Sequence, residues 1–177
     1  MNTVQLILII VFTLLNILFN WYVSLRDRRF HAIFRFVGFE CIFLLVILNY
    51  PVWFKDPFTW EQLTSWAFLI LSLVAALIGF YTYYKRGKPE DLLEETVHIV
   101  SNGIYKYVRH PMYLSLIAGA IGVVMKDPGT VQVIIGAINI VAMYLTARIE
   151  EREMIVKFGD EYMDYMKKTA MFVPFIL

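Results

Sequence analysis

The sequence predicts an all-α protein, a polytopic integral membrane bundle of about five transmembrane helices. Three observations lead to this prediction. Of the 177 residues, 59% are hydrophobic and 18% are charged, and the mean hydropathy is +0.62, which lies outside the usual balance of a soluble domain. Several uncharged runs approach the roughly 20 residues that cross a hydrocarbon core. The charged residues lie between these runs and are unequally divided between the two sides.

Five apolar runs are expected to span the membrane. The first has no charged residue from Met1 to Leu25 and lacks the basic leading region of a signal peptide, so we expect it to be retained. The second contains Glu40, which is costly in lipid unless it faces the bundle interior, a cavity or the interface. Basic residues or turns separate the runs. The expected spans are 3–25, 36–54, 62–84, 111–125 and 130–147.

The fourth run is short for a full crossing and is expected to form a hairpin with the fifth. Pro111 suits the first turn of its helix, where the missing N–H is not needed. Residues 126–129, with the sequence KDPG, predict a tight turn before the fifth run. Ala118 and Gly122 lie one turn apart and are small enough to let two helices approach closely.

Two polar segments complete the chain. Residues 85–110 are too polar to span a membrane. In residues 148–177, apolar side chains recur at helical spacing among charged ones, which predicts an amphipathic tail on the membrane surface. Gly159 and Asp160 are expected to divide that tail into two helices. No repeat or interdomain linker is visible, so we expect one domain over 1–177.

The basic residues predict the orientation. Apart from Lys55 and Lys126, every Lys and Arg falls in residues 26–35, in residues 85–110 or in the tail. The positive-inside rule therefore places these segments in the cytoplasm and the N-terminus outside. The short chain favours a prokaryotic cell membrane over the endoplasmic reticulum. Tyr83 with Tyr84 is interpreted as part of an interfacial aromatic belt.

Several classes of site are not expected. A net charge of +1 without a concentrated basic face gives no support for nucleic-acid binding. The single cysteine, Cys41, excludes an internal disulfide and a thiolate metal cluster. His31, His98 and His110 are widely spaced, so we expect no metal site. No glycine-rich Rossmann fingerprint is present, which argues against a soluble-type cofactor domain. Oligomeric state is not predicted, because contacts between spans and between subunits use the same small-residue faces.

The stretch from Glu94 to Tyr113 is where we expect the reactive site. It places two of the three histidines, an Asn-Gly turn and an Arg-His-Pro triplet beside apolar runs. Catalysis needs fixed polar groups in a partly water-excluded place, and such a segment beside membrane helices provides one. Simpler interpretations stay open: Arg109 is also typical of a snorkelling anchor, and Glu150 with Glu151 is typical of a charged helix surface.

Three motifs, in this order, resemble the isoprenylcysteine carboxyl methyltransferase family. They are GIY at 103–105, RHPMY at 109–113, and EE at 150–151 followed by FGDEY at 158–162. The RHPxY string alone also occurs in phospholipid methyltransferases and sterol reductases. Followed by a hairpin and then EE and FGxxY, it is more specific. The first three spans resemble the family only in hydropathy.

This resemblance implies a multi-span fold whose cytoplasmic end, including residues 85–110, binds S-adenosylmethionine. It also implies methylation of the carboxylate of a prenylated C-terminal cysteine, a lipophilic partner that enters from the bilayer. The family's substrate-orienting arginine corresponds here to Thr146, and the nearby basic residue is Arg148. By position, the residues expected to contact the cofactor are Val97, His98, Ile99, Val100, Tyr105, His110, Pro111, Met112, Tyr113 and Glu150.

The chemistry of these residues suits methyl transfer, in which much of the rate enhancement comes from positioning two bound reactants. A carboxylate acceptor is already ionised, with an ordinary pKa of about 3.5, and needs no general base. We expect Arg148 or Arg109 to hold it, because a rigid guanidinium suits this task better than lysine. Glu150 suits the cofactor's ammonium or hydroxyls, and His110 suits its carboxylate. Tyr105 or Tyr113 offers an aromatic wall for its adenine.

Other functions stay open at this point. Within the same chemistry, the acceptor would be a phospholipid amine or a small thiol, and an amine would depend on a base with a pKa near 7. A sterol-reductase-like enzyme would instead bind NADPH. A non-catalytic membrane protein or a transporter is disfavoured, because the ionisable residues gather at one end and not at the membrane midplane, where transport sites usually lie.

Overall fold

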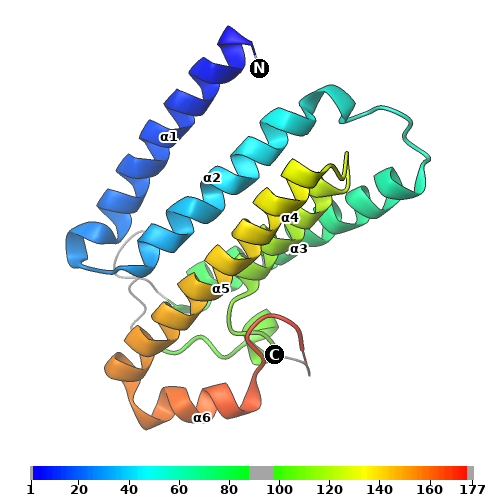
Figure 1. Cartoon of the computed structure of the whole chain (residues 1–177). Coiled ribbons are helices and arrows are strands. Elements are labelled where there is room, and N and C mark those ends of the chain that lie inside the picture. The colour runs from blue at the N-terminus through cyan, green and yellow to red at the C-terminus, as the bar shows by residue number, and fades with distance from the viewer. Residues whose placement is uncertain (1, 88–97, 175–177) are drawn as a thin grey trace.

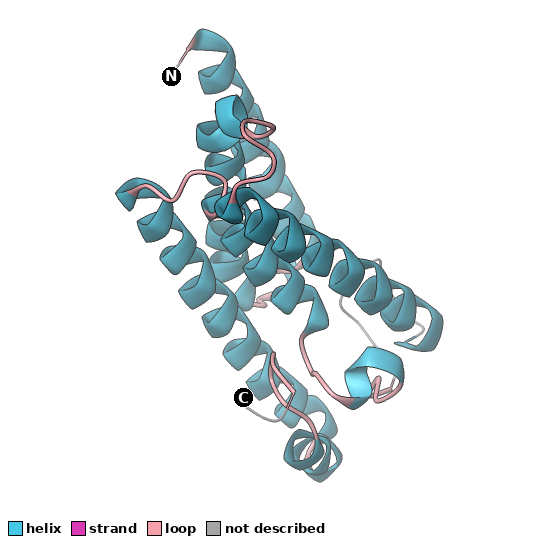
Figure 2. Cartoon of the chain, turned by 90° about the vertical axis from the view of Figure 1, so that its right-hand side faces the viewer, coloured by secondary structure: helices cyan, strands magenta, loops and turns pink. Residues whose placement is uncertain are grey.

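A computed structural model describes residues 2–87 and 98–174 (Figure 1). In these ranges the chain is helical apart from its connections and one isolated β-bridge (Figure 2). The α-helices are α1 (Thr3–Val23), α2 (His31–Asn49), α3 (Trp60–Gly87), α4 (Pro111–Val124), α5 (Thr130–Phe158) and α6 (Asp160–Lys168). Short 3-10 helices are η1 (Leu25–Asp27), η2 (Tyr50–Val52) and η3 (Gly103–Lys106).

Within the described ranges, α1, α2, α3 and α5 are long and apolar enough to cross a membrane, by length and composition. Large apolar side chains remain exposed along these helices, as lipid-facing surfaces require. The helix α4 has 14 residues and is shorter than the roughly 20 that a full crossing needs. The prediction of a polytopic helical membrane protein is confirmed.

Small residues let α4 pack closely against its neighbours. A Cβ atom added to Gly122 would lie 2.9 Å from Cγ of Leu69 on α3, and one added to Gly119 would lie 3.0 Å from Oγ of Ser72. On its other side, Ala120 and Val123 join Leu45 of α2 in a buried apolar cluster. The helix α4 therefore lies between α3 and the pair α2 and α5 (Figure 1).

Polar side chains join α1 to α2 at the edge of the bundle. Asn16 donates to Oε1 of Glu40 over 2.9 Å, and Thr13 donates to Oε2 of the same carboxylate over 3.1 Å. Closer to the connection, Nε of Arg35 donates to Oδ1 of Asn20 over 3.0 Å. Glu40 thus faces a neighbouring helix. The second helix begins at His31, before the expected start at 36, and so includes Arg35.

The helix α5 does not end at 147 as expected. It runs from Thr130 to Phe158, 29 residues in all, because residues 148–158 lack a helix-breaking residue and the change in composition alters only the surroundings of the helix. His31 Nδ1 lies 2.9 Å from Oε2 of Glu153 and joins the start of α2 to this extension. At Gly159 the backbone φ is +58°, which favours glycine, and α6 begins at the next residue, as predicted.

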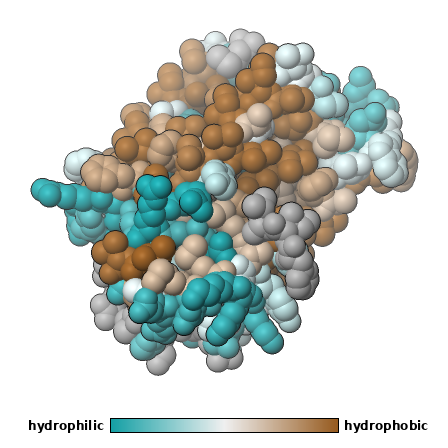
Figure 3. Space-filling model, turned by 60° about the horizontal axis from the view of Figure 1, so that its bottom comes forward, coloured by the Kyte–Doolittle hydropathy of each residue, from teal (hydrophilic) through white to brown (hydrophobic). Residues whose placement is uncertain are grey.

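The helix α6 lies across one end of the bundle (Figure 1). Polar side chains gather at this end, whereas apolar ones cover the helices behind it (Figure 3). After α6, residues 169–172, which we call the C-terminal strap, run beside the segment that precedes α4. The N–H of Arg109 donates to the carbonyl of Ala170 over 2.8 Å, and that of His110 to the carbonyl of Met171 over 3.1 Å. Met171 and Phe172 are buried in the core.

Candidate functional site

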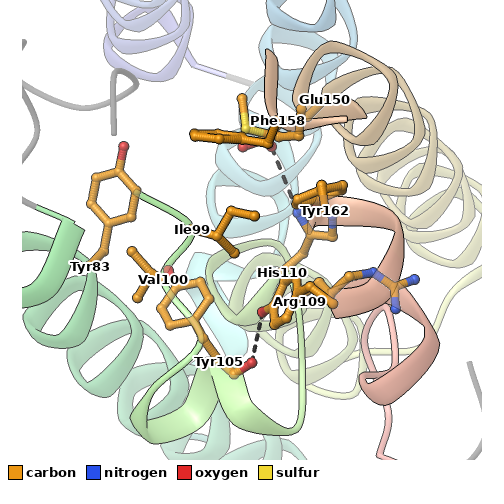
Figure 4. Close-up of a pocket in the computed structure, with 11 residues that line it drawn as sticks. Tyr83, Ile99, Val100, Tyr105, Arg109, His110, Glu150, Phe158 and Tyr162 are labelled. Carbon is orange, nitrogen blue, oxygen red and sulfur yellow. Dashed lines mark hydrogen bonds and ion pairs between the residues drawn. The ribbon is translucent and has the colours of Figure 1, made fainter. Parts of the chain in front are cut away.

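Two contiguous cavities lie at the end of the bundle that α6 covers, and Figure 4 shows the larger one. They share the lining residues Tyr83, Tyr105, Arg109, His110 and Glu150. The larger holds about 500 Å³ of empty space, including the solvent at its mouth, and the smaller about 290 Å³. Residues from α3, η3, α4, α5 and α6 contribute to the walls, so segments far apart in the sequence form one site.

A glycine turn positions the tyrosine of the GIY motif. Gly103 has a φ of +60°, and a Cβ atom there would lie 3.1 Å from Oγ1 of Thr82 on α3. The 3-10 helix η3 that starts at this glycine buries Tyr105 in the wall of both cavities. The hydroxyl of Tyr165 on α6 donates to the carbonyl of Tyr105 over 2.7 Å and fixes the turn.

The imidazole of His110 is held between aromatic rings and two carboxylates. Its ring stacks on Tyr113 with centroids 5.4 Å apart, and the ring of Phe172 from the C-terminal strap lies 6.2 Å away. Its Nδ1 lies 3.7 Å from Oε2 of Glu150, and its Nε2 lies 3.5 Å from Oε1 of Glu151. These contacts fix the imidazole in the cavity wall, facing the two acidic residues of α5.

Three polar atoms of this site are buried without a hydrogen-bond partner among the described residues. They are the hydroxyl of Tyr105, Nε2 of His110 and Oε2 of Glu150. Buried polar groups are nearly always paired, and leaving one unpaired costs about 1–3 kcal/mol. Burial, followed by the charge of Glu150, raises the pKa of the Tyr105 phenol, which therefore stays a neutral hydrogen-bond donor at physiological pH. Such an arrangement suits a ligand that brings its own donors and acceptors.

The remaining wall is aromatic and thioether surface that the sequence did not assign to the site. Glu150, Met154 and Phe158 follow one another at four-residue spacing on one face of α5, and all three line the larger cavity. Tyr162 of α6 and Tyr83 of α3 also contribute to this wall (Figure 4). The interpretation of Tyr83 as a belt residue is corrected, because its side chain lines both cavities. The four-residue spacing after Glu150 was the signal that could have found Met154.

Most of the residues expected to bind a cofactor come together here. The cavities are lined by Ile99, Val100, Tyr105, His110, Pro111, Met112, Tyr113 and Glu150. His98 is exposed and does not line either cavity, and Val97 lies outside the described residues.

The two arginines expected to hold a substrate lie in different surroundings. Nε of Arg109 lies 2.6 Å from Oε1 of Glu151, and its Nη1 donates to the carbonyls of Met166 and Thr169. Its guanidinium points away from the other lining side chains (Figure 4). Arg148 is exposed on α5 and lines neither cavity. A contact between either arginine and a substrate stays a prediction.

A family model for phospholipid methyltransferases matches residues 61–161, more than half of the chain. The chain belongs to the phospholipid methyltransferase family. This confirms the family-level resemblance found in the sequence. The matched region runs from the start of α3 to the start of α6 and therefore contains most of the residues that line the cavities.

Individual relatives carry two different names. Methanethiol S-methyltransferase 1 from Bradyrhizobium diazoefficiens is 32% identical over 71 residues, which are 40% of this chain and 24% of that protein. Methanethiol S-methyltransferase from Mycobacterium tuberculosis is 30% identical over 89 residues, 50% of this chain and 34% of that protein. Protein-S-isoprenylcysteine O-methyltransferase from Schizosaccharomyces pombe is 34% identical over 80 residues, 44% of this chain and 34% of that protein. The match thus spans about a third or less of each of these relatives.

Proposed function

We propose that the protein is an S-adenosylmethionine-dependent membrane methyltransferase and that its cofactor binds in the two contiguous cavities. When bound, S-adenosylmethionine supplies an activated methyl group on a sulfonium. One observation carries this proposal: three buried atoms that make no hydrogen bond within the described chain belong to Tyr105, His110 and Glu150, which all line one cavity. They belong to the same motifs that carry the family resemblance.

The residues present fit the groups of this cofactor. The carboxylate of Glu150 can accept hydrogen bonds from an ammonium or from ribose hydroxyls. The imidazole of His110 can donate to a carboxylate, and the neutral phenol of Tyr105 can donate to a ring nitrogen or a hydroxyl. The aromatic rings of Tyr83 and Phe158 offer stacking surface for a purine. Holding several groups at once fixes the orientation of the cofactor, which is the main requirement of this chemistry.

The acceptor that we propose first is the carboxylate of a prenylated cysteine or a similar lipophilic acid. The site lies at one end of apolar helices, where a membrane-dissolved acceptor can meet a water-soluble cofactor. Arg148 is exposed on α5 and lies two residues after Thr146, the position that corresponds to the family's substrate-orienting arginine. It is therefore our candidate for orienting the acceptor carboxylate. The relative named protein-S-isoprenylcysteine O-methyltransferase, 34% identical over 80 residues, supports this choice.

A small thiol is the second candidate acceptor. It is favoured by the relatives named methanethiol S-methyltransferase, which are 32% identical over 71 residues and 30% identical over 89 residues. A thiol is mostly protonated at neutral pH and must lose its proton before it attacks, so its methylation rate would rise between pH 6 and 8. A carboxylate is fully ionised over this range, and its methylation would not show that rise.

We also propose that the end of the bundle with the cavities faces the cytoplasm of a prokaryotic cell. Of all Lys and Arg residues, only Lys55 and Lys126 lie at the opposite end by this topology. The natural cysteine, Cys41, is buried. A thiol reagent added outside intact cells therefore reports on single cysteines introduced by Lys167→Cys or by Lys55→Cys. Labelling of Lys55→Cys alone supports the orientation, and labelling of Lys167→Cys alone reverses it.

The experiment that tests the function uses purified protein and S-adenosylmethionine with a radiolabelled methyl group. A farnesylated cysteine, methanethiol and phosphatidylethanolamine are supplied in parallel, with Glu150→Gln as the inactive comparison. We expect label in the farnesylated cysteine. Label in methanethiol alone supports the second candidate. If no acceptor receives label and the protein also fails to bind S-adenosylhomocysteine, the proposal is contradicted.

A further inference from the structure

We infer that Arg109 is a positioning residue, which clamps the C-terminal strap beneath His110 and so makes the strap part of the cofactor site. This inference rests on the proposed function, because it assigns a role within the same cavities. This role differs from the one expected from the sequence, in which Arg109 contacts the acceptor directly. Three sets of observations lead to it: the partners of the guanidinium, the pairing of the strap, and the surroundings of Glu151.

The guanidinium of Arg109 joins two elements that follow the site in sequence. Its side chain is 9% exposed. One side contacts the carboxylate of Glu151 on α5, at 2.6 Å, and the other donates to the carbonyls of Met166, at 3.2 Å, and Thr169, where α6 gives way to the strap. Charge-assisted bonds of this kind are the strong ones. These bonds engage Nε and Nη1 and hold the guanidinium away from the other side chains that line the cavity (Figure 4).

The strap in turn fixes the orientation of His110. The carbonyl of Ala170 accepts from the N–H of Arg109 at 2.8 Å, and the carbonyl of Met171 accepts from the N–H of His110 at 3.1 Å. The ring of Phe172 then lies 6.2 Å from the imidazole. A strap that is released from Arg109 would therefore remove one of the two aromatic neighbours of the imidazole and its backbone hydrogen bond.

The contact with Arg109 also gives the buried carboxylate of Glu151 a cationic partner. This residue is 2% exposed, and its Oε1 lies 3.5 Å from Nε2 of His110 as well as 2.6 Å from Arg109. A buried carboxylate that loses its cation needs another partner, and the imidazole is within reach. With Arg109 in place, Nε2 of His110 makes no hydrogen bond within the described chain and is left for a ligand.

The test measures S-adenosylhomocysteine binding by calorimetry in detergent. The variants are Arg109→Gln, Arg109→Lys, Glu151→Gln and the double variant Arg109→Gln with Glu151→Gln. The matched control is Arg152→Gln, an exposed arginine one residue after Glu151 that lines neither cavity.

We expect Arg109→Gln to weaken binding at least tenfold. Arg109→Lys should weaken it less, because lysine keeps the positive charge but lacks the several fixed donors of the planar guanidinium. The double variant is expected to bind more tightly than Arg109→Gln alone, because it no longer contains an unpaired buried carboxylate. Arg152→Gln is expected to bind as wild type does. Unchanged binding by Arg109→Gln, with a raised KM for the acceptor only, would overturn the inference.

Hydrogen exchange gives a second readout that does not depend on the cofactor. The amides of His110 and of the strap should exchange faster in Arg109→Gln and Arg109→Lys, whereas amides in α1 and α2 should not change. If the strap amides stay as protected as in wild type, the clamp is absent. Failure of the wild type to bind S-adenosylhomocysteine would instead refute the proposed cofactor, and the exchange result would still decide whether Arg109 holds the strap.

Discussion

The substitution Tyr105→Phe should move stability and ligand affinity in opposite directions. It removes one oxygen atom, which is buried in the cavity wall without a hydrogen bond in the described chain. An unpaired buried hydroxyl costs about 1–3 kcal/mol, so its removal should leave the ligand-free protein equally stable or more stable. A hydrogen bond to a bound ligand contributes about 0.5–1.5 kcal/mol, and its loss should weaken binding roughly 2- to 13-fold.

The matched control is Tyr165→Phe. This hydroxyl also belongs to a cavity-lining tyrosine, but it already donates to the carbonyl of Tyr105 over 2.7 Å. Its removal breaks a made bond, so the ligand-free protein should lose about 0.5–1.5 kcal/mol of unfolding free energy. The two substitutions therefore remove the same chemical group but are expected to change stability in opposite directions.

Both variants are measured by thermal unfolding and by calorimetric titration with S-adenosylhomocysteine, on the same preparations. The expected pattern for Tyr105→Phe is an unchanged or higher Tm together with a larger Kd. A lower Tm for Tyr105→Phe with an unchanged Kd would refute the reasoning, because it would mean that the hydroxyl serves the fold and not a ligand.

Further substitutions separate the parts of the site. Glu150→Gln should weaken S-adenosylhomocysteine binding roughly 10- to 150-fold in calorimetry, because a hydrogen bond to a charged group contributes about 1.5–3 kcal/mol. Gly103→Ala should lower the unfolding free energy by about 1–2 kcal/mol in denaturant titration, because its φ is +60°; no loss would mean that the turn is not constrained. Arg148→Gln should raise the KM for a farnesylated cysteine without changing S-adenosylhomocysteine affinity, and an unchanged KM would exclude it from the acceptor site. Burial raises the pKa of the phenols of Tyr105 and Tyr162 above the ordinary value of 10.0. The unfolded chain therefore loses these protons first, and thermal stability that is present below pH 10 should be lost as the pH rises beyond it, whereas a flat profile to pH 11 would contradict the burial of these groups.

Local patterns in the sequence predict the helices and much of the cavity. Uncharged runs and turn residues place α1, α3 and α4 close to their expected ranges, because hydropathy and breaker residues act locally. The RHPMY motif brings His110 and Tyr113 into the lining for a similar reason, since Pro111 starts α4 and fixes what lies on either side. The predicted end of this span at residue 147 was wrong, because a change from apolar to charged residues does not end a helix that lacks a helix-breaking residue.

Contacts between distant segments could not be predicted from the sequence. Arg109 has its carboxylate partner 42 residues later, in Glu151, and its carbonyl acceptor 60 residues later, at Thr169. Tyr83 has the position of a membrane-belt residue in sequence, and only the placement of α3 beside η3 brings it into the cavity wall. The pairing of the strap with the segment before α4 is a single β-bridge, which is too short to have a strand pattern of its own.

The identity of the cofactor is decided by calorimetric titration of the wild-type protein with S-adenosylhomocysteine, beside His110→Ala and with NADPH as the comparison ligand. We expect wild type to bind S-adenosylhomocysteine, His110→Ala to lose most of this affinity, and NADPH to give no heat of binding. Binding of NADPH without binding of S-adenosylhomocysteine would contradict the account and assign the cavity to a reductase.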